Sequence, residues 1–131
     1  DILLCGNYGD PIYHPDLPGM VRVLKSRGSH VTITTNGSYK TQGWWDQLVA
    51  LLDARDTVIF SIDGTPDNFT QYRENADWIS IEIGLRSCVS GPSRVIWKYI
   101  PFRFNQDTIE QARSCALDLG VDDFQITPSD R

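Results

Sequence analysis

Short apolar runs alternate along the chain with longer segments in which apolar residues recur every three or four positions. The short runs are rich in β-branched residues and predict five strands, at residues 2–5, 30–35, 57–62, 95–100 and 123–127. The longer segments predict four helices, at residues 17–25, 44–52, 78–88 and 109–119. The third of these contains WISIEIGL, which also alternates, so its pattern fits a strand as well as a helix.

Polar residues and glycines mark where the predicted helices begin and end. Asp16, Thr41 and Asp107 stand just before helical segments, where a side-chain oxygen accepts hydrogen bonds from the first free N–H groups. Gly28 and Gly120 follow two of the segments and predict their C-terminal ends. The boundaries therefore agree with the periodicity.

The element order βαβαβαβαβ predicts an α/β fold, a parallel β-sheet with alternating helices. Strands joined by helical crossovers pair in parallel, in an open sheet or as part of a barrel. The length of 131 residues fits a single domain, residues 1–131. In both architectures ligands bind at the carboxyl ends of the strands, so the residues that follow each strand are the candidates for function.

Charge and composition exclude several kinds of partner. The formal net charge of −5 argues against binding to nucleic acid or to an anionic membrane surface, because both need a basic face. No apolar run approaches the ~20 residues that span a bilayer. Cys5, Cys88 and Cys115 have neither metal-site nor disulfide spacing, which predicts reduced cysteines in a cytoplasmic protein, all three as small buried side chains.

Polar residues and glycines follow the predicted strands. They include the turn GNYGDP at residues 6–11, then Thr35 and Asn36, Ser61 and Asp63, and Lys98. Such an edge suits a small polar ligand that carries an amine, a carboxylate or a ribose. The same residue types dominate turns for backbone reasons alone, so a purely structural role stays open.

Several familiar sites are missing from the sequence. It contains no Gly-x-Gly-x-x-Gly, no Gly-x-x-x-x-Gly-Lys-Ser/Thr and no Gly-x-Ser-x-Gly, which argues against a classical dinucleotide site, a nucleotide-triphosphate site and a hydrolase elbow. His14 lies in a predicted loop and His30 begins a predicted strand, and both are interpreted as structural or solvent-facing.

Four stretches, taken in order, resemble the radical S-adenosylmethionine superfamily. They are CGNYGDPIYHPDL, TITTNGS, FSIDG and WKYIPFRFNQDTIEQARSCALDLGVDDFQI. The resemblance is closest to members with a twitch or SPASM-type C-terminal extension. It implies part of a (β/α)6 partial TIM barrel, with this chain covering the second to the sixth strand of the family.

The resemblance gives the turn after the first strand a role. In the family, a Gly-Gly-Glu-Pro-like turn binds the amino group of S-adenosylmethionine. Gly9, Asp10 and Pro11 match its last three positions, while Tyr8 replaces the first glycine. The shorter acid, Asp10, still accepts charge-assisted hydrogen bonds from an ammonium group.

The resemblance also assigns residues on the later strands to the cofactor site. Thr35 and Asn36 would lie near S-adenosylmethionine, and Ser61 would reach its ribose or carboxylate. Asp63 would lie beside Ser61, nearer the substrate.

Two more residues complete the implied site. Lys98 would face the barrel interior if Ile96 and Ile100, which alternate with it, do so too. Ile126 would pack against the adenine.

The family's chemistry needs Cys-x-x-x-Cys-x-x-Cys, whose thiolates hold a 4Fe-4S cluster that reductively cleaves S-adenosylmethionine to a 5′-deoxyadenosyl radical. The motif is absent, and the sequence begins one strand too late to contain it. Cys5 alone is no substitute. We therefore expect the central part of such an enzyme, which by itself holds no iron, binds the cofactor weakly and is inactive.

Partners follow from the same interpretation. The twitch-like character predicts a peptide or protein substrate. The edge of the first strand, at Ile2-Leu3-Leu4, would lack its neighbour and favour self-association.

Two other functions remain in play at this point. One is a non-catalytic α/β module that binds a small molecule or acts as a scaffold. The other is a flavodoxin-like domain that binds a flavin or a phosphate, although the first turn lacks the Ser and Thr residues suited to a phosphate.

Overall fold

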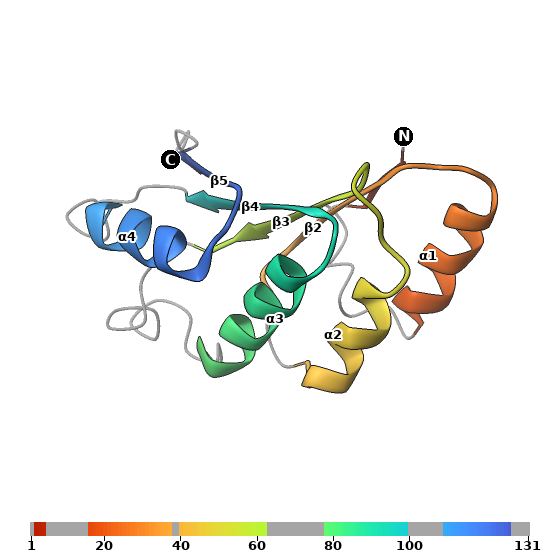
Figure 1. The fold of residues 1–131 in the computed structure, drawn as a ribbon, viewed down its shortest axis with the longest axis horizontal. Coiled ribbons are helices and arrows are strands. Elements are labelled where there is room, and N and C mark those ends of the chain that lie inside the picture. The colour runs from red at the N-terminus through yellow and green to blue at the C-terminus, as the bar shows by residue number, and fades with distance from the viewer. Residues whose placement is uncertain (1, 5–15, 38–39, 63–77, 100–108, 127–131) are drawn as a thin grey trace.

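The computed structural model describes residues 2–4, 16–37, 40–62, 78–99 and 109–126 (Figure 1). Its five strands are β1 (Ile2–Leu4), β2 (Val31–Thr35), β3 (Thr57–Ser61), β4 (Arg94–Tyr99) and β5 (Asp123–Ile126). Its four helices are α1 (Leu17–Ser26), α2 (Gln42–Val49), α3 (Trp78–Ser90) and α4 (Ile109–Leu119). Strands and helices alternate throughout, as the sequence pattern predicts.

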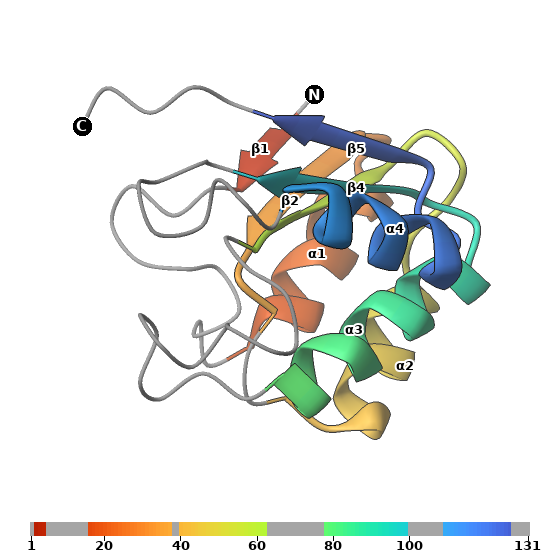
Figure 2. The same cartoon turned by 90° about the vertical axis from the view of Figure 1, so that its left-hand side faces the viewer.

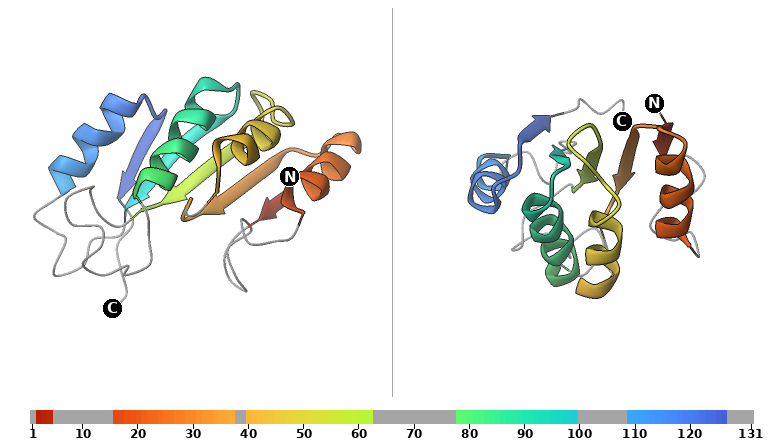
Figure 3. Two further views of the ribbon diagram at one scale, coloured as in Figure 1. Left: turned by 90° about the horizontal axis from the view of Figure 1, so that it is seen from below. Right: turned by 45° about the vertical axis from the view of Figure 1, so that its right-hand side comes forward.

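All strand pairs are parallel, and the sheet order is β1-β2-β3-β4-β5, the order of the chain. The four helices cover one face of the sheet, and no helix of the described residues lies on the other face (Figures 2 and 3). This arrangement confirms the predicted α/β fold with its parallel, barrel-type sheet. A flavodoxin-like sheet has the order 2-1-3-4-5 and helices on both faces, so that alternative is wrong.

The predicted caps that the structure describes are found, whereas α2 ends at Val49, three residues before its predicted end. The Asp16 carboxylate accepts a hydrogen bond from the N–H of Gly19 at 3.0 Å, and the Thr41 hydroxyl accepts one from Trp44 at 3.2 Å. Gly120, just after α4, has a φ of 83°, a left-handed conformation that suits glycine after a helix. The third cap predicted, Asp107, lies outside the described residues.

The core lies between the sheet and the helices. Its fully buried aromatic residues come from α2, β3 and β4, and they are Trp45, Phe60, Trp97 and Tyr99. The indole N–H of Trp97 donates to the carbonyl of Ile62 at 2.9 Å, which satisfies a polar group that burial would otherwise leave without a partner. The backbone N–H of Ile62 donates to the backbone carbonyl of Lys98 at 3.1 Å and extends the β3–β4 pairing past Ser61.

α2 and α3 approach each other closely at Gly84. A methyl group at this position would lie 2.6 Å from ring carbons of Trp45. A larger residue at this position would require the Trp45 side chain or one of the helices to shift, so Gly84 allows the close approach of α2 and α3.

The two remaining predictions about the surface have different outcomes. β1 pairs with β2 on one side, and no other described strand lies against it, so self-association through this edge stays a prediction. Among the described helices, none combines the length and the apolar character needed to cross a membrane.

Candidate functional site

The face of the sheet without helices is identified by the alternation along the strands. In β3, Val58 and Phe60 are fully buried in the core under the helices, whereas Thr57, Ile59 and Ser61 are partly exposed. Successive side chains of a strand point to opposite faces, so these three residues lie on the helix-free face. Ser61 is the one at the carboxyl end.

A row of polar residues crosses the carboxyl end of this face. Ser61 of β3 is in register with Lys98 of β4, and Lys98 is in register with Gln125 of β5. Thr35 of β2 is in register with Phe60 of β3. Asn36 and Ser61 are the next residues along the two segments, so they lie at the same level of the sheet. We call Asn36, Ser61, Lys98 and Gln125 the polar row. It combines two amides, a hydroxyl and an ammonium group, which suit a polar ligand that carries anionic or hydroxyl groups.

The orientation of Lys98 can be decided from its neighbours on β4. Trp97 and Tyr99 are fully buried in the core cluster beneath the helices. Ile96 is only 5% exposed but does not belong to that cluster, as expected for a residue on the opposite face. Lys98 therefore lies on the same face of the sheet as Ile96, as predicted. Ile100, the other residue that was expected to share this face, lies outside the described residues.

Thr35 has a different position from the polar row. It is 3% exposed and follows Val31 and Ile33 in the buried set of β2. Its hydroxyl oxygen accepts a hydrogen bond from the N–H of Gly37 at 3.1 Å, and Gly37 has a φ of 75°. The side chain of Thr35 therefore stabilises the turn that carries Asn36.

Ile126 lies at the carboxyl end of β5, in register with Tyr99. Alternation along β5 places it on the opposite face from Gln125, and it is 41% exposed. Its predicted contact with an adenine stays a prediction. Five other predicted site residues lie outside the described part of the chain: Tyr8, Gly9, Asp10, Pro11 and Asp63.

Gln125 is the member of the row that the sequence did not reveal. The available signal was its place next to the apolar Phe124 in the predicted strand at residues 123–127, since neighbouring side chains of a strand point to opposite faces. In the structure Phe124 packs on Trp97, with ring centroids 5.8 Å apart. The amide of Gln125 donates to the carboxylate of Asp123 at 2.9 Å. Arg94 also approaches that carboxylate, at 3.4 Å. The charge of Asp123 is thus balanced within the sheet face.

The cysteines of the described chain do not form a metal site. Cys88 is fully buried, and burial raises the pKa of its thiol to about 12. Cys115 is only half-buried, in contrast to the full burial expected. Its pKa is raised, mainly by burial and to a smaller extent by the negative charges of Glu82 and Asp118. No cluster of three His, Cys, Asp or Glu side chains suited to a metal occurs among the described residues. These residues therefore do not fit a 4Fe-4S cluster, which binds thiolates.

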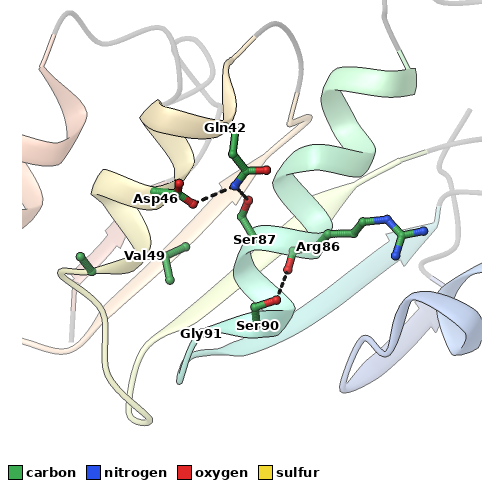
Figure 4. A pocket seen from close by; sticks show the side chains of 8 residues that line it. Gln42, Asp46, Val49, Arg86, Ser87, Ser90 and Gly91 are labelled. Carbon is green, nitrogen blue, oxygen red and sulfur yellow. Dashed lines mark hydrogen bonds between the residues drawn. The ribbon is translucent and has the colours of Figure 1, made fainter.

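A second feature lies between α2 and α3, across the sheet from the polar row. It is an open cleft of about 390 Å³ (Figure 4). The amide of Gln42 donates to Asp46 at 2.7 Å and to Ser87 at 2.6 Å, and the Ser90 hydroxyl donates to the carbonyl of Arg86 at 2.9 Å. The hydrogen bond from Gln42 to Ser87 joins the two helices, and the other two lie within α2 and within α3, so the cleft is explained as part of the helix packing.

Comparison with known proteins supports the barrel-type fold. No protein-family model matches the sequence, and no curated protein is significantly similar to it. Among solved structures, TYW1 with a lysine-pyruvate adduct bound has a TM-score of 0.69 and 16% identity, covering 94% of this chain and 40% of that protein. SuiB from Streptococcus suis has a TM-score of 0.73 and 12% identity, covering 94% of this chain and 28% of SuiB.

Both neighbours are radical S-adenosylmethionine enzymes. At identities of 16% and 12%, the likeness shows a shared fold. The chain spans less than half the length of either protein.

Proposed function

We propose that this chain is the central part of a radical S-adenosylmethionine enzyme and that its carboxyl edge binds the cofactor. The observation that carries the proposal is the polar row, which crosses the helix-free face at the end where parallel α/β sheets bind ligands. The shared fold with two radical S-adenosylmethionine enzymes supports it.

The proposed contacts follow from the chemistry of each side chain. The hydroxyl of Ser61 and the amide of Asn36 bind the ribose or carboxylate of S-adenosylmethionine. The carboxylate of Asp10 binds its amino group. Ile126 lies on the face opposite the polar row, so its contact with the adenine would have to be made around the carboxyl end of β5. Thr35 acts through the turn that positions Asn36, because its hydroxyl is held by Gly37.

The 4Fe-4S cluster requires ligands from outside the described residues. In the proposed full-length enzyme, a Cys-x-x-x-Cys-x-x-Cys motif supplies them, and the present chain contributes the cofactor edge. A twitch or SPASM-type extension, a peptide or protein substrate and a cytoplasmic location belong to the same proposal.

Binding of S-adenosylmethionine by equilibrium dialysis tests the role of the edge. We expect weak binding by the 131-residue chain, and Ser61→Ala or Asn36→Ala to weaken it by about fivefold, the effect of one hydrogen bond. Thr57→Ala is the matched control, because it removes a hydroxyl from the same face of β3 at the opposite end. Absence of binding by the unmodified chain, or an equal loss in Thr57→Ala, would contradict the proposal.

A further inference from the structure

The turn that follows β2 packs directly on the ring of Phe60. A Cβ atom added at Gly37 would lie 2.9 Å from both Cδ2 and Cε2 of that ring and 3.7 Å from the side chain of Ile81 on α3. Carbon atoms that are not bonded to each other pack best at about 3.5–4.0 Å. The backbone of Gly37 therefore contacts the ring so closely that no side chain fits between them.

The ring of Phe60 is itself held by the hydrophobic core. It is fully buried, and its centroid lies 5.6 Å from that of the Trp45 ring on α2. Trp45 is also fully buried and packs on α3 at Gly84. Because protein cores are close-packed, these neighbours leave Phe60 few other positions. The core thus presents a fixed surface to the turn.

A second glycine shows that this contact is more than a backbone requirement. Gly28, after α1, has a φ of 80°, and its N–H donates to the carbonyl of Lys25 at 3.0 Å. Gly37 has a φ of 75°, and its N–H donates to the hydroxyl of Thr35 at 3.1 Å. The two turns need glycine for the same backbone reason. A Cβ atom at Gly28, however, would meet nothing within 4 Å.

We propose that Phe60 is a positioning residue for ligand binding at the carboxyl edge of the sheet. Its ring fixes the turn at residues 35–37 and thereby holds Asn36 at the level of Ser61. The inference rests on the proposed function in that the ligand of Asn36 is the one proposed above. It adds a buried residue that acts through the turn, because a binding group displaced by about 1 Å loses much of its effect.

Hydrogen exchange of backbone amides, followed by NMR, tests the effect on the turn. Phe60→Leu removes the ring carbons that Gly37 contacts. We expect exchange of the Gly37 amide to accelerate by about tenfold more than that of the Gly28 amide, because only the first turn loses its support. Val58→Ala is the control, since Val58 is a buried residue of the same face of β3, nearer its amino end. It is expected to change both amides by the same factor.

Binding of S-adenosylmethionine, measured by equilibrium dialysis, tests the effect on the ligand. We expect Phe60→Leu to weaken binding by about fivefold, as expected for Asn36→Ala. In the double variant the two losses are not additive, because a misplaced Asn36 and a missing one have the same consequence. A purely structural role of Phe60 predicts additive losses instead. Thermal unfolding of each variant verifies that the fold is intact.

Gly37→Ala provides a second test if Phe60→Leu does not fold. The added methyl group would meet the Phe60 ring, and we expect binding of S-adenosylmethionine to weaken by about fivefold or more. Gly28→Ala is the matched control, because it has the same unfavourable φ without the contact. It is expected to lower the thermal stability and to leave binding unchanged.

The inference and the proposed function fail in different ways. If Asn36→Ala weakens binding while Phe60→Leu and Gly37→Ala do not, the role of Phe60 is refuted and the cofactor edge stands. Equal acceleration of the two glycine amides in Phe60→Leu also refutes it. If the unmodified chain does not bind S-adenosylmethionine, the proposed function fails, and the exchange rates alone decide whether Phe60 fixes the turn.

Discussion

The Nζ atom of Lys25 lies 2.9 Å from Oδ1 and 2.8 Å from Oδ2 of Asp56, a residue that is fully buried just before β3. The same carboxylate accepts hydrogen bonds from the backbone N–H groups of Val31 at 2.8 Å and Asp53 at 2.7 Å. Asp56 thus joins α1, β2 and the start of β3. The amino end of the sheet carries these stabilising contacts, and the carboxyl end carries the polar row.

Removal of the Asp56 carboxylate is expected to be strongly destabilising. Asp56→Ala leaves the Lys25 ammonium and two backbone donors without their acceptor, which costs about 3–5 kcal/mol of unfolding free energy. Urea unfolding measures this loss. Asp118→Ala, at an exposed position on α4, is expected to change stability by less than about 0.5 kcal/mol. A loss below about 1 kcal/mol in Asp56→Ala would contradict this role.

Asp53 gives the stability a dependence on acidic pH. Hydrogen bonds from the Arg55 guanidinium at 3.2 Å, the Arg55 backbone N–H at 2.8 Å and Lys25 at 3.0 Å hold the pKa of the Asp53 carboxyl well below its usual range. A lowered pKa stabilises the folded state while the pH exceeds the unfolded value of about 3.9, and the contribution is lost as the pH falls further.

Asp53→Asn is therefore expected to reduce stability at neutral pH and to differ less from the unmodified chain below about pH 4. Urea unfolding at a series of pH values checks this. A difference between the two proteins that stays constant from neutral to acidic pH would show that the ionisation of Asp53 does not contribute.

Two glycines offer a matched test of the helix packing. The methyl group of Gly84→Ala would lie 2.6 Å from Trp45 and is expected to cost about 1–3 kcal/mol by overpacking. Gly43 in α2 is exposed, and the nearest atom to an added methyl is the Thr41 hydroxyl at 4.0 Å. Gly43→Ala is therefore expected to stabilise the chain by about 0.5–1 kcal/mol. Equal effects at the two positions would argue against the close contact of α2 and α3.

Thiol labelling tests the environment of Cys88. Because burial raises its pKa to about 12, the folded chain holds it as an unreactive thiol at mildly alkaline pH. We expect iodoacetamide to leave Cys88 unmodified in the folded chain and to alkylate it after unfolding in urea, as read by peptide mass spectrometry. Labelling of Cys88 at the same rate in both states would rule out this burial.

Much of the fold could be predicted from the sequence because local chemistry and hydrophobic pattern agree. The carboxylate of Asp16 and the hydroxyl of Thr41 cap helices where they were expected to. α3 was ambiguous because its apolar residues fit both periods. The pairing of Glu82 with Arg86, four residues apart and 3.1 Å between charged atoms in the structure, was the local signal for a helix.

The site was less accessible to sequence reasoning because the face on which a residue lies depends on register. Ser61 and Lys98 were recognised as residues of strand ends, but their pairing with each other and with Gln125 is long-range. Thr35 was assigned to the site from its place at a strand end and from the family resemblance. In the structure it is buried on the core side of β2, where its hydroxyl accepts a hydrogen bond from Gly37, and the sequence pattern alone did not reveal this contact.

The most direct test of the central claim is the coding sequence upstream of the codon for Asp1, read over about one βα unit, ~30 residues or more. The account predicts an in-frame Cys-x-x-x-Cys-x-x-Cys motif, which makes Asn36 and Ser61 the residues to mutate in the complete enzyme. A stop codon, or a start codon just before Asp1, would contradict it and would leave a non-catalytic α/β binding module.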